Sequence, residues 1–123
     1  MGKKGKMSRQ KGHAFEREIA QAFRLVFPEA RRHLEYQKSE ARGFDIANTG
    51  KYRIQCKRGR RYASLSAIKE VDADEVLGEV PVLVTRGDNE PALVALPLDE
   101  FMRLLYAAGV DNGTREKRYR LKQ

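Results

Sequence analysis

Three polar side chains near the middle of the sequence are of the types that hydrolyse phosphodiester bonds. Asp45 lies between two apolar residues, and further along the chain Gln55 and Lys57 flank Cys56. Residues two apart on a strand face the same side. If the alternating apolar residues of both segments, from Phe44 to Cys56, face the core, then Asp45, Gln55 and Lys57 converge on the opposite face.

A carboxylate, an amide oxygen and an ammonium group together suit metal-assisted hydrolysis. Asp45 and Gln55 offer the oxygen ligands that Mg²⁺ prefers, with Mn²⁺ as a substitute. Such a metal polarises the phosphate and acidifies a bound water. Lys57 would orient that water or stabilise the charge that develops on the phosphoryl oxygens. The alternative is that all three are ordinary surface residues of a hairpin.

The first expected helix adds a carboxylate to this set. Its apolar stripe centres on Phe15, Ile19 and Val26, so Glu16 and Glu18 fall on the two flanks of the stripe. Either glutamate could lean over the edge of the sheet, and periodicity does not choose between them. The alternative is an acidic first turn that the helix dipole favours without any active site.

Hydrophobic periodicity and turn residues predict the elements that position these side chains. Helices are expected over 12–27, from 64 or 66 to 77, and over 99–108; strands are expected over 32–37, 44–48, 52–58, 80–85 and 92–96. This order predicts an α/β protein with a mixed central sheet flanked by helices. We expect a flexible basic arm over 1–11, one domain over 12–109 and a basic tail over 110–123.

Composition points to a polyanionic partner. The chain has 123 residues, 25 Lys and Arg against 17 acidic residues, and a net charge of +8. This surplus favours nucleic acid over a merely solvated basic surface. The single cysteine excludes an intramolecular disulfide, and no apolar run approaches the roughly 20 residues of a membrane span. We therefore expect a cytoplasmic protein of a prokaryotic cell or of a virus-infected prokaryotic host.

Basic residues near the predicted site and in the arm are candidates for contact with DNA phosphates, although solvated charge is the alternative. These candidates are Lys3, Lys4, Lys6, Arg9, Lys11, His13, Lys38, Arg58, Arg60 and Arg61.

Several short motifs together resemble a known nuclease family. Residues 12–19 have the sequence Gly-His-Ala-Phe-Glu-Arg-Glu-Ile, residues 43–46 Gly-Phe-Asp-Ile, and residues 54–57 Ile-Gln-Cys-Lys. In this order and spacing they resemble the archaeal-type Holliday junction resolvases of the PD-(D/E)XK nuclease superfamily. The resemblance extends over about residues 11–105 and implies a restriction-endonuclease-like core.

The resemblance also implies roles for individual residues. Asp45 matches the metal-binding aspartate and Lys57 the catalytic lysine. Glu16 matches the helix glutamate, which either belongs to the metal site or supports its ligands. Gln55 stands where the family usually has a second acidic ligand. Ser39 lies near the position of a loop serine that touches the scissile strand. The implied activity is Mg²⁺-dependent resolution of four-way DNA junctions by paired nicks.

Two features depart from the family pattern and keep alternatives open. Phe44 replaces the proline that often precedes the aspartate, and Gln55 removes one negative charge from the metal site. Gln-x-Lys versions occur in Mrr-like restriction endonucleases, so another nuclease of the superfamily is one alternative. A non-catalytic DNA-binding protein with a degenerate site is the other. Paired nicks need two active sites, which predicts a homodimer through apolar residues of 65–77 or 101–106.

Overall fold

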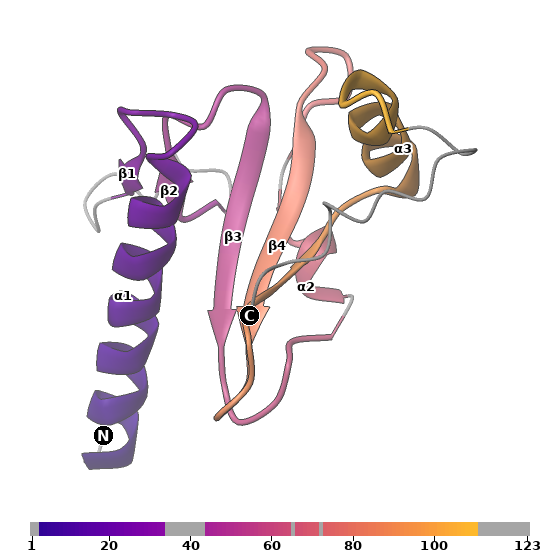
Figure 1. Cartoon of the computed structure of the whole chain (residues 1–123). Coiled ribbons are helices and arrows are strands. Elements are labelled where there is room, and N and C mark those ends of the chain that lie inside the picture. The colour runs from indigo at the N-terminus through magenta and orange to yellow at the C-terminus, as the bar shows by residue number, and fades with distance from the viewer. Residues whose placement is uncertain (1–2, 34–43, 65, 72, 111–123) are drawn as a thin grey trace.

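The alternating segment 52–58 forms the central strand of a computed structural model that describes residues 3–33, 44–64, 66–71 and 73–110 (Figure 1). The elements in chain order are α1 (Lys3–Phe23), β1 (Arg31–Arg32), β2 (Ile46–Ala47), β3 (Tyr52–Arg58), α2 (Ser66–Lys69), β4 (Val80–Arg86), β5 (Leu93–Ala95) and α3 (Leu98–Ala107).

The five strands form one mixed sheet in the order β1-β2-β3-β4-β5. β3 and β4 are parallel, and the other neighbouring pairs are antiparallel. The parallel pair is joined by a crossover that contains α2, as a parallel connection requires. The predicted α/β class with a mixed sheet and flanking helices is confirmed at this level.

The core lies between α1 and one face of the sheet. Phe15 and Ile19 of α1 pack with Ile54 and Cys56 of β3, and Ile54 is only 1% exposed. The apolar stripe of the helix and the alternation of the strand therefore meet as the sequence predicts. Cys56 is a buried core residue, also as predicted.

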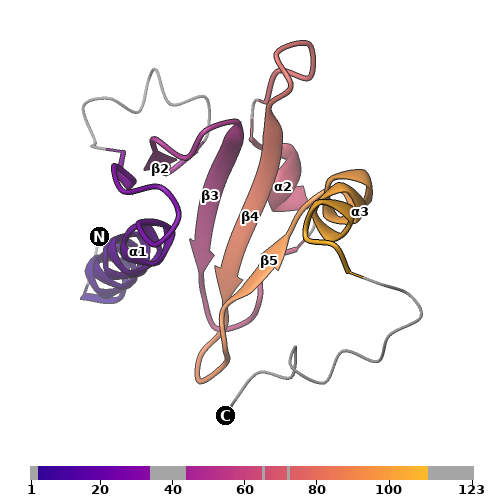
Figure 2. The same ribbon diagram turned by 45° about the horizontal axis from the view of Figure 1, so that its top comes forward.

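The other face of the sheet is covered by α2. Leu83 alternates with the core residues of β4, so it points away from α1, and it is only 1% exposed. Ala67 and Val71, in and just after α2, are buried too. Figure 2 shows α1 on the β2 and β3 side of the sheet and α2 next to β4.

The hairpin turn before β3 follows from its sequence. Asn48 and Gly50 have φ values of 67° and 61°, a region that asparagine and glycine tolerate best. The Thr49 hydroxyl donates to the Tyr52 carbonyl at 2.8 Å. The predicted turn at 48–51 and the antiparallel pairing of β2 with β3 are both confirmed.

The first helix differs from its predicted bounds at both ends. It begins at Lys3 rather than at residue 12, so residues 3–11, most of the predicted flexible arm, are helical. Lys, Arg, Gln and Met are good helix formers, and no proline interrupts residues 3–11, although Gly5 lowers the local helix propensity. At the other end the chain turns after Phe23 and packs Phe27 against the core, which leaves Val26 72% exposed.

The second helix is much shorter than predicted. It ends at Lys69 rather than at residue 77, and Val76 is 94% exposed. The Asp74 side chain accepts the Val76 amide at 2.9 Å, and Glu79 accepts the Asp74 amide at 2.9 Å. These side-chain bonds replace the helical ones, which is how Asp commonly ends helices and forms turns.

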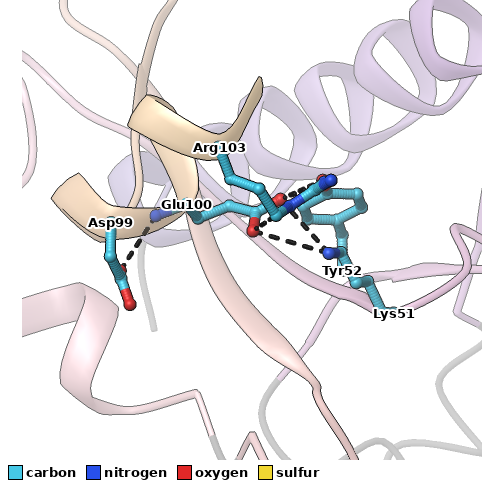
Figure 3. A network of polar contacts seen from close by, with 5 residues as sticks. All are labelled: Lys51, Tyr52, Asp99, Glu100 and Arg103. Atoms are coloured by element: carbon cyan, nitrogen blue, oxygen red, sulfur yellow. Dashed lines mark hydrogen bonds and ion pairs between the residues drawn. The ribbon is translucent and has the colours of Figure 1, made fainter. Parts of the chain in front are cut away.

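The last helix agrees with prediction to within one residue and is tied to the start of β3. Glu100 is 7% exposed and accepts hydrogen bonds from the Tyr52 hydroxyl and from Arg103 at 2.9 Å (Figure 3). Lys51 lies 3.4 Å from the same carboxylate. The Arg103 hydrogen bond is the main reason that the pKa of Glu100 falls to about 2.

Some predictions lie outside the described residues. These are most of the expected strand over 32–37, the expected loop with the candidate residues Lys38 and Ser39, and the expected basic tail from residue 111. Within the described residues, no helix combines the length and apolar character needed to cross a membrane.

Candidate active site

Asp45 sits at a bend where β2 has not yet begun. Its backbone amide donates to the Ile54 carbonyl at 2.7 Å, and its carboxylate Oδ2 accepts the Cys56 amide at 2.9 Å. A side chain thus takes a hydrogen bond that a continuing strand would make with its backbone. The strand expected over 44–48 is accordingly reduced to Ile46–Ala47.

The bend also moves Phe44 out of the core. The Arg53 guanidinium lies 5.1 Å from the Phe44 ring, and His33 packs edge-on to that ring at 5.3 Å. Arg53 alternates with Ile54 and so lies on the face away from α1. The prediction that Phe44 faces the core is therefore wrong, and simple alternation does not place the Asp45 side chain.

Glu16 lies on the flank of α1 that faces β1. It is 8% exposed, and the Arg32 Nε donates to its Oε1 at 2.9 Å. Burial chiefly raises the pKa of the Cys56 thiol, and the negative charges of Asp45 and Glu16 raise it further. Both carboxylates therefore act on the same buried thiol.

Glu18 points to the other flank of α1. Its two carboxylate oxygens accept hydrogen bonds from Arg86 of β4, each at 2.9 Å. The Arg86 hydrogen bond lowers the pKa of Glu18. Tertiary contacts thus distinguish the two glutamates, because Glu18 is engaged by Arg86 of β4 and Glu16 by Arg32 of β1.

Gln55 and Lys57 lie together on the face opposite the Cys56 side chain. Both contact Glu70, whose Oε2 is 3.4 Å from Gln55 Nε2 and 3.4 Å from Lys57 Nζ. Gln55 is 6% exposed, and its Oε1 is buried without a hydrogen-bond partner among the described residues. A buried amide oxygen without a partner is uncommon and is open to a ligand.

Glu70 is the residue that sequence reasoning missed. It follows α2 directly and lies 15 residues from Gln55 along the chain. The contact arises because the crossover returns α2 to the sheet next to β4. No sequence signal marks Glu70, since the apolar residues alone predict the helix in this segment.

The side chains at positions 45 and 55 carry oxygen donors of the types that bind hard divalent cations. Asp45 binds the amide next to Gln55, and the Gln55 oxygen lacks a partner in the described part of the chain. Carboxylate and amide oxygens are ligands that Mg²⁺ accepts. Among the residues described, no three His, Cys, Asp or Glu side chains are grouped to hold a metal ion.

Several predicted DNA contacts gather at the carboxyl ends of β3 and β4. Asp88 lies 2.8 Å from Arg58 and 4.0 Å from Lys11, so it links β3 to α1. Its amide donates to the Arg60 carbonyl at 3.0 Å. The Arg58 hydrogen bond lowers the pKa of Asp88. The Asp88 carboxylate thus contacts basic side chains from both α1 and β3.

The remaining basic candidates are more scattered. Arg61 is exposed next to this group, Arg9 is exposed on α1, and His13 is half-buried there. Lys3, Lys4 and Lys6 belong to the first turns of α1.

Comparison of the chain with protein-family models, with curated proteins and with solved structures found no match.

Proposed function

We propose that this protein is a metal-dependent endodeoxyribonuclease of the PD-(D/E)XK kind that resolves four-way DNA junctions by paired nicks. The observation that carries the proposal is the buried Gln55 oxygen, which has no hydrogen-bond partner among the described residues, on the strand that also holds Lys57. The Cys56 amide, which donates to Asp45 at 2.9 Å, belongs to the residue between them. The mixed sheet with a helix on each face supports a restriction-endonuclease-like core.

In this proposal each site residue has a separate role in phosphodiester hydrolysis. Asp45 and Gln55 would hold Mg²⁺, or Mn²⁺ in its place, with Glu16 assisting. The ion supplies polarisation of the scissile phosphate and a more acidic water. Lys57 directs its ammonium group toward the attacking water or the charged phosphoryl oxygens. The Gln55 oxygen, without a partner among the described residues, supports a role as a neutral ligand.

Glu70 acts as a positioning residue in this proposal. Its ion pair with Lys57 and its contact with the Gln55 amide fix both side chains at once. With Nε2 directed to Glu70, the Gln55 oxygen is left for a cation. Glu70 also supplies part of the negative charge that the site lacks because residue 55 is a glutamine and not a carboxylate.

We assign binding of the DNA backbone to the cations at the carboxyl ends of β3 and β4. Lys11, Arg58 and Arg60 approach one another around Asp88, one to three residues beyond Lys57 on the β3 side. Phosphates would compete with Asp88 for these groups. Binding should therefore weaken steeply with salt, because it releases counterions from DNA.

A homodimer is part of the same proposal, because a four-way junction with near two-fold symmetry needs two active sites. Exposed apolar residues on α3 and β5 support an interface there: Phe101 is 47%, Met102 55%, Leu98 73% and Val94 56% exposed. Sedimentation of the wild type and of Phe101→Asp tests it. A dimer that becomes a monomer in the variant is expected, and a monomeric wild type would remove this part of the proposal.

The decisive experiment uses a labelled four-way junction and the matching linear duplex, each with Mg²⁺ or Mn²⁺, and compares the wild type with Asp45→Asn. We expect symmetric paired nicks on the junction alone, lost in the variant. Cutting of the linear duplex equally well would leave another nuclease of the superfamily, of a restriction or repair kind.

A second candidate function is a non-catalytic DNA-binding protein. It is favoured by the neutral Gln55 at a position where the family usually has a carboxylate, and by the Lys57–Glu70 ion pair that occupies the ammonium group. Tight junction binding without cutting in either metal would favour this candidate and exclude the enzyme.

A further inference from the structure

A groove on the outer side of α1 is lined mainly by arginines. It has a volume of about 430 Å³ and lies between α1 and β1. Its lining residues are Arg17, Ala20, Gln21, Arg24, Arg31 and Arg32. None of the four arginines is among the cations at the ends of β3 and β4.

Two of these arginines are held in place by one nitrogen each. Arg24 Nε donates to the Ala30 carbonyl at 2.7 Å, and Arg32 Nε donates to Glu16 at 2.9 Å. Within the described part of the chain, the terminal nitrogens of both side chains make no further hydrogen bond. Anchored guanidinium groups lose little conformational entropy when they bind a ligand.

The other two arginines carry no compensating charge from the described part of the chain. Arg17 and Arg31 are exposed, and neither forms an ion pair with another residue that the structure describes. Four guanidinium groups therefore share one groove with the nearby carboxylate of Glu16. Such crowding of like charge is relieved when an anion binds, and the planar guanidinium fork matches phosphate oxygens.

The position of the groove connects it to the candidate active site. Arg32 lines the groove and also binds Glu16. Glu18, on the opposite flank of α1, faces β4 and Arg86. The groove therefore lies on the β1 side of the helix, away from the Asp88 group.

We infer that this arginine groove binds the phosphate backbone of DNA as a second contact surface beside the site. The inference rests on the proposed DNA substrate but not on cleavage. A strand that leaves the site past Glu16 would meet Arg32 first and then the other arginines. One DNA molecule would thus be held on both flanks of α1, as a branched substrate with separate arms allows.

Equilibrium binding to the labelled four-way junction in EDTA, at several salt concentrations, tests the groove. Arg17→Gln and Arg31→Gln are compared with Lys69→Gln, which removes one exposed charge far from the groove. We expect each arginine variant to weaken binding at all concentrations and to reduce the slope of log K against log salt by about 1. Lys69→Gln should leave the slope unchanged, and circular dichroism checks the fold of each variant.

The outcomes separate this inference from the proposed nuclease. Unchanged slopes in a wild type that cuts DNA would overturn the groove and leave the enzyme. Reduced slopes in a protein that never cuts would support the groove and remove the enzyme. If inorganic phosphate raises the melting temperature of the wild type but not of Arg17→Gln, while the DNA slopes stay equal, the groove is a free-anion site and the inference fails.

Discussion

The carboxylate of Asp45 accepts the backbone amide of Cys56 at 2.9 Å, in place of a backbone partner from β2. Asparagine can accept the same bond through its side-chain oxygen, whereas alanine leaves the amide without it. We therefore expect Asp45→Asn to keep nearly wild-type stability and Asp45→Ala to lose about 1–3 kcal/mol. Both should lose at least about 100-fold in nicking rate if the carboxylate holds the metal. Thermal melts and junction nicking measure the two effects separately.

Gln55→Glu should bind metal more tightly but be less stable without it. The change removes the donor to Glu70 and places two carboxylates side by side. We expect a lower melting temperature in EDTA, a larger rise with Mn²⁺ than the wild type shows, and an affinity for Mn²⁺ higher by on the order of tenfold. Calorimetric titration measures that affinity.

The matched control for this change is Gln55→Leu, which removes the oxygen and keeps a similar volume. It should show no metal-dependent rise in melting temperature. Equal Mn²⁺ affinities in the wild type, Gln55→Glu and Gln55→Leu would mean that residue 55 is not a ligand.

Glu70→Gln tests whether this residue positions Lys57. The pair is about half exposed, so losing it should cost under about 1 kcal/mol of stability. We expect kcat for nicking to fall roughly tenfold with KM nearly unchanged, because the lysine loses its fixed position. Glu75→Gln makes the same charge change on an exposed residue of the same crossover. An equal fall in both variants would point to a general effect of charge and not to positioning.

Much of the sheet could be predicted because its signals are local. Strict alternation predicts β3 at 52–58, and a continuous apolar run predicts β4 to within one residue of its end. The helix at the end of the domain is bounded by an acidic first turn and by Gly109, whose φ is 72°. These features depend on neighbouring residues alone, so no tertiary information is needed.

The candidate site could be predicted only in part, because its geometry depends on distant contacts. Strand alternation brings Gln55 and Lys57 to one face, but the bend at Asp45 breaks the alternation on which its predicted orientation depended. The Glu70 contact depends on how the crossover returns α2 to the sheet next to β4. Further along the crossover, the side chains of Asp74 and Glu79 accept backbone amides, and these bonds compete with helix formation.

The buried Glu100 makes stability depend on acid pH. Its folded pKa is about 2, well below that of an ordinary glutamate, so the folded state favours its charged form. The stabilisation is complete above the unfolded pKa of about 4.5 and is lost as the pH falls toward 2. We expect Glu100→Gln to melt well below the wild type at pH 7 and the difference to shrink as the pH falls from about 4.5 to about 2. A constant difference over that range would mean that the charge of Glu100 is not what stabilises α3.

Gly87→Ala should disturb the cations at the end of β3 without removing any charge. A Cβ at residue 87 would lie 3.0 Å from the Arg60 carbonyl oxygen and 3.1 Å from the Arg61 Cα, so the backbone there must shift. That shift would strain the bond from the Asp88 amide to Arg60. We expect a melting temperature a few degrees lower, by about 1 kcal/mol of stability, and weaker junction binding in EDTA.

Gly12→Ala is the matched control, because a Cβ at residue 12 meets nothing within 4 Å. In the interior of α1 the change to alanine should stabilise the protein by up to about 1 kcal/mol and leave junction binding unchanged. Junction affinity should thus fall for Gly87→Ala alone. If Gly87→Ala loses stability but binds the junction as tightly as the wild type, then the position of the Arg60 and Arg61 backbone does not matter for phosphate contact. That result would contradict the assignment of DNA binding to this end of the sheet.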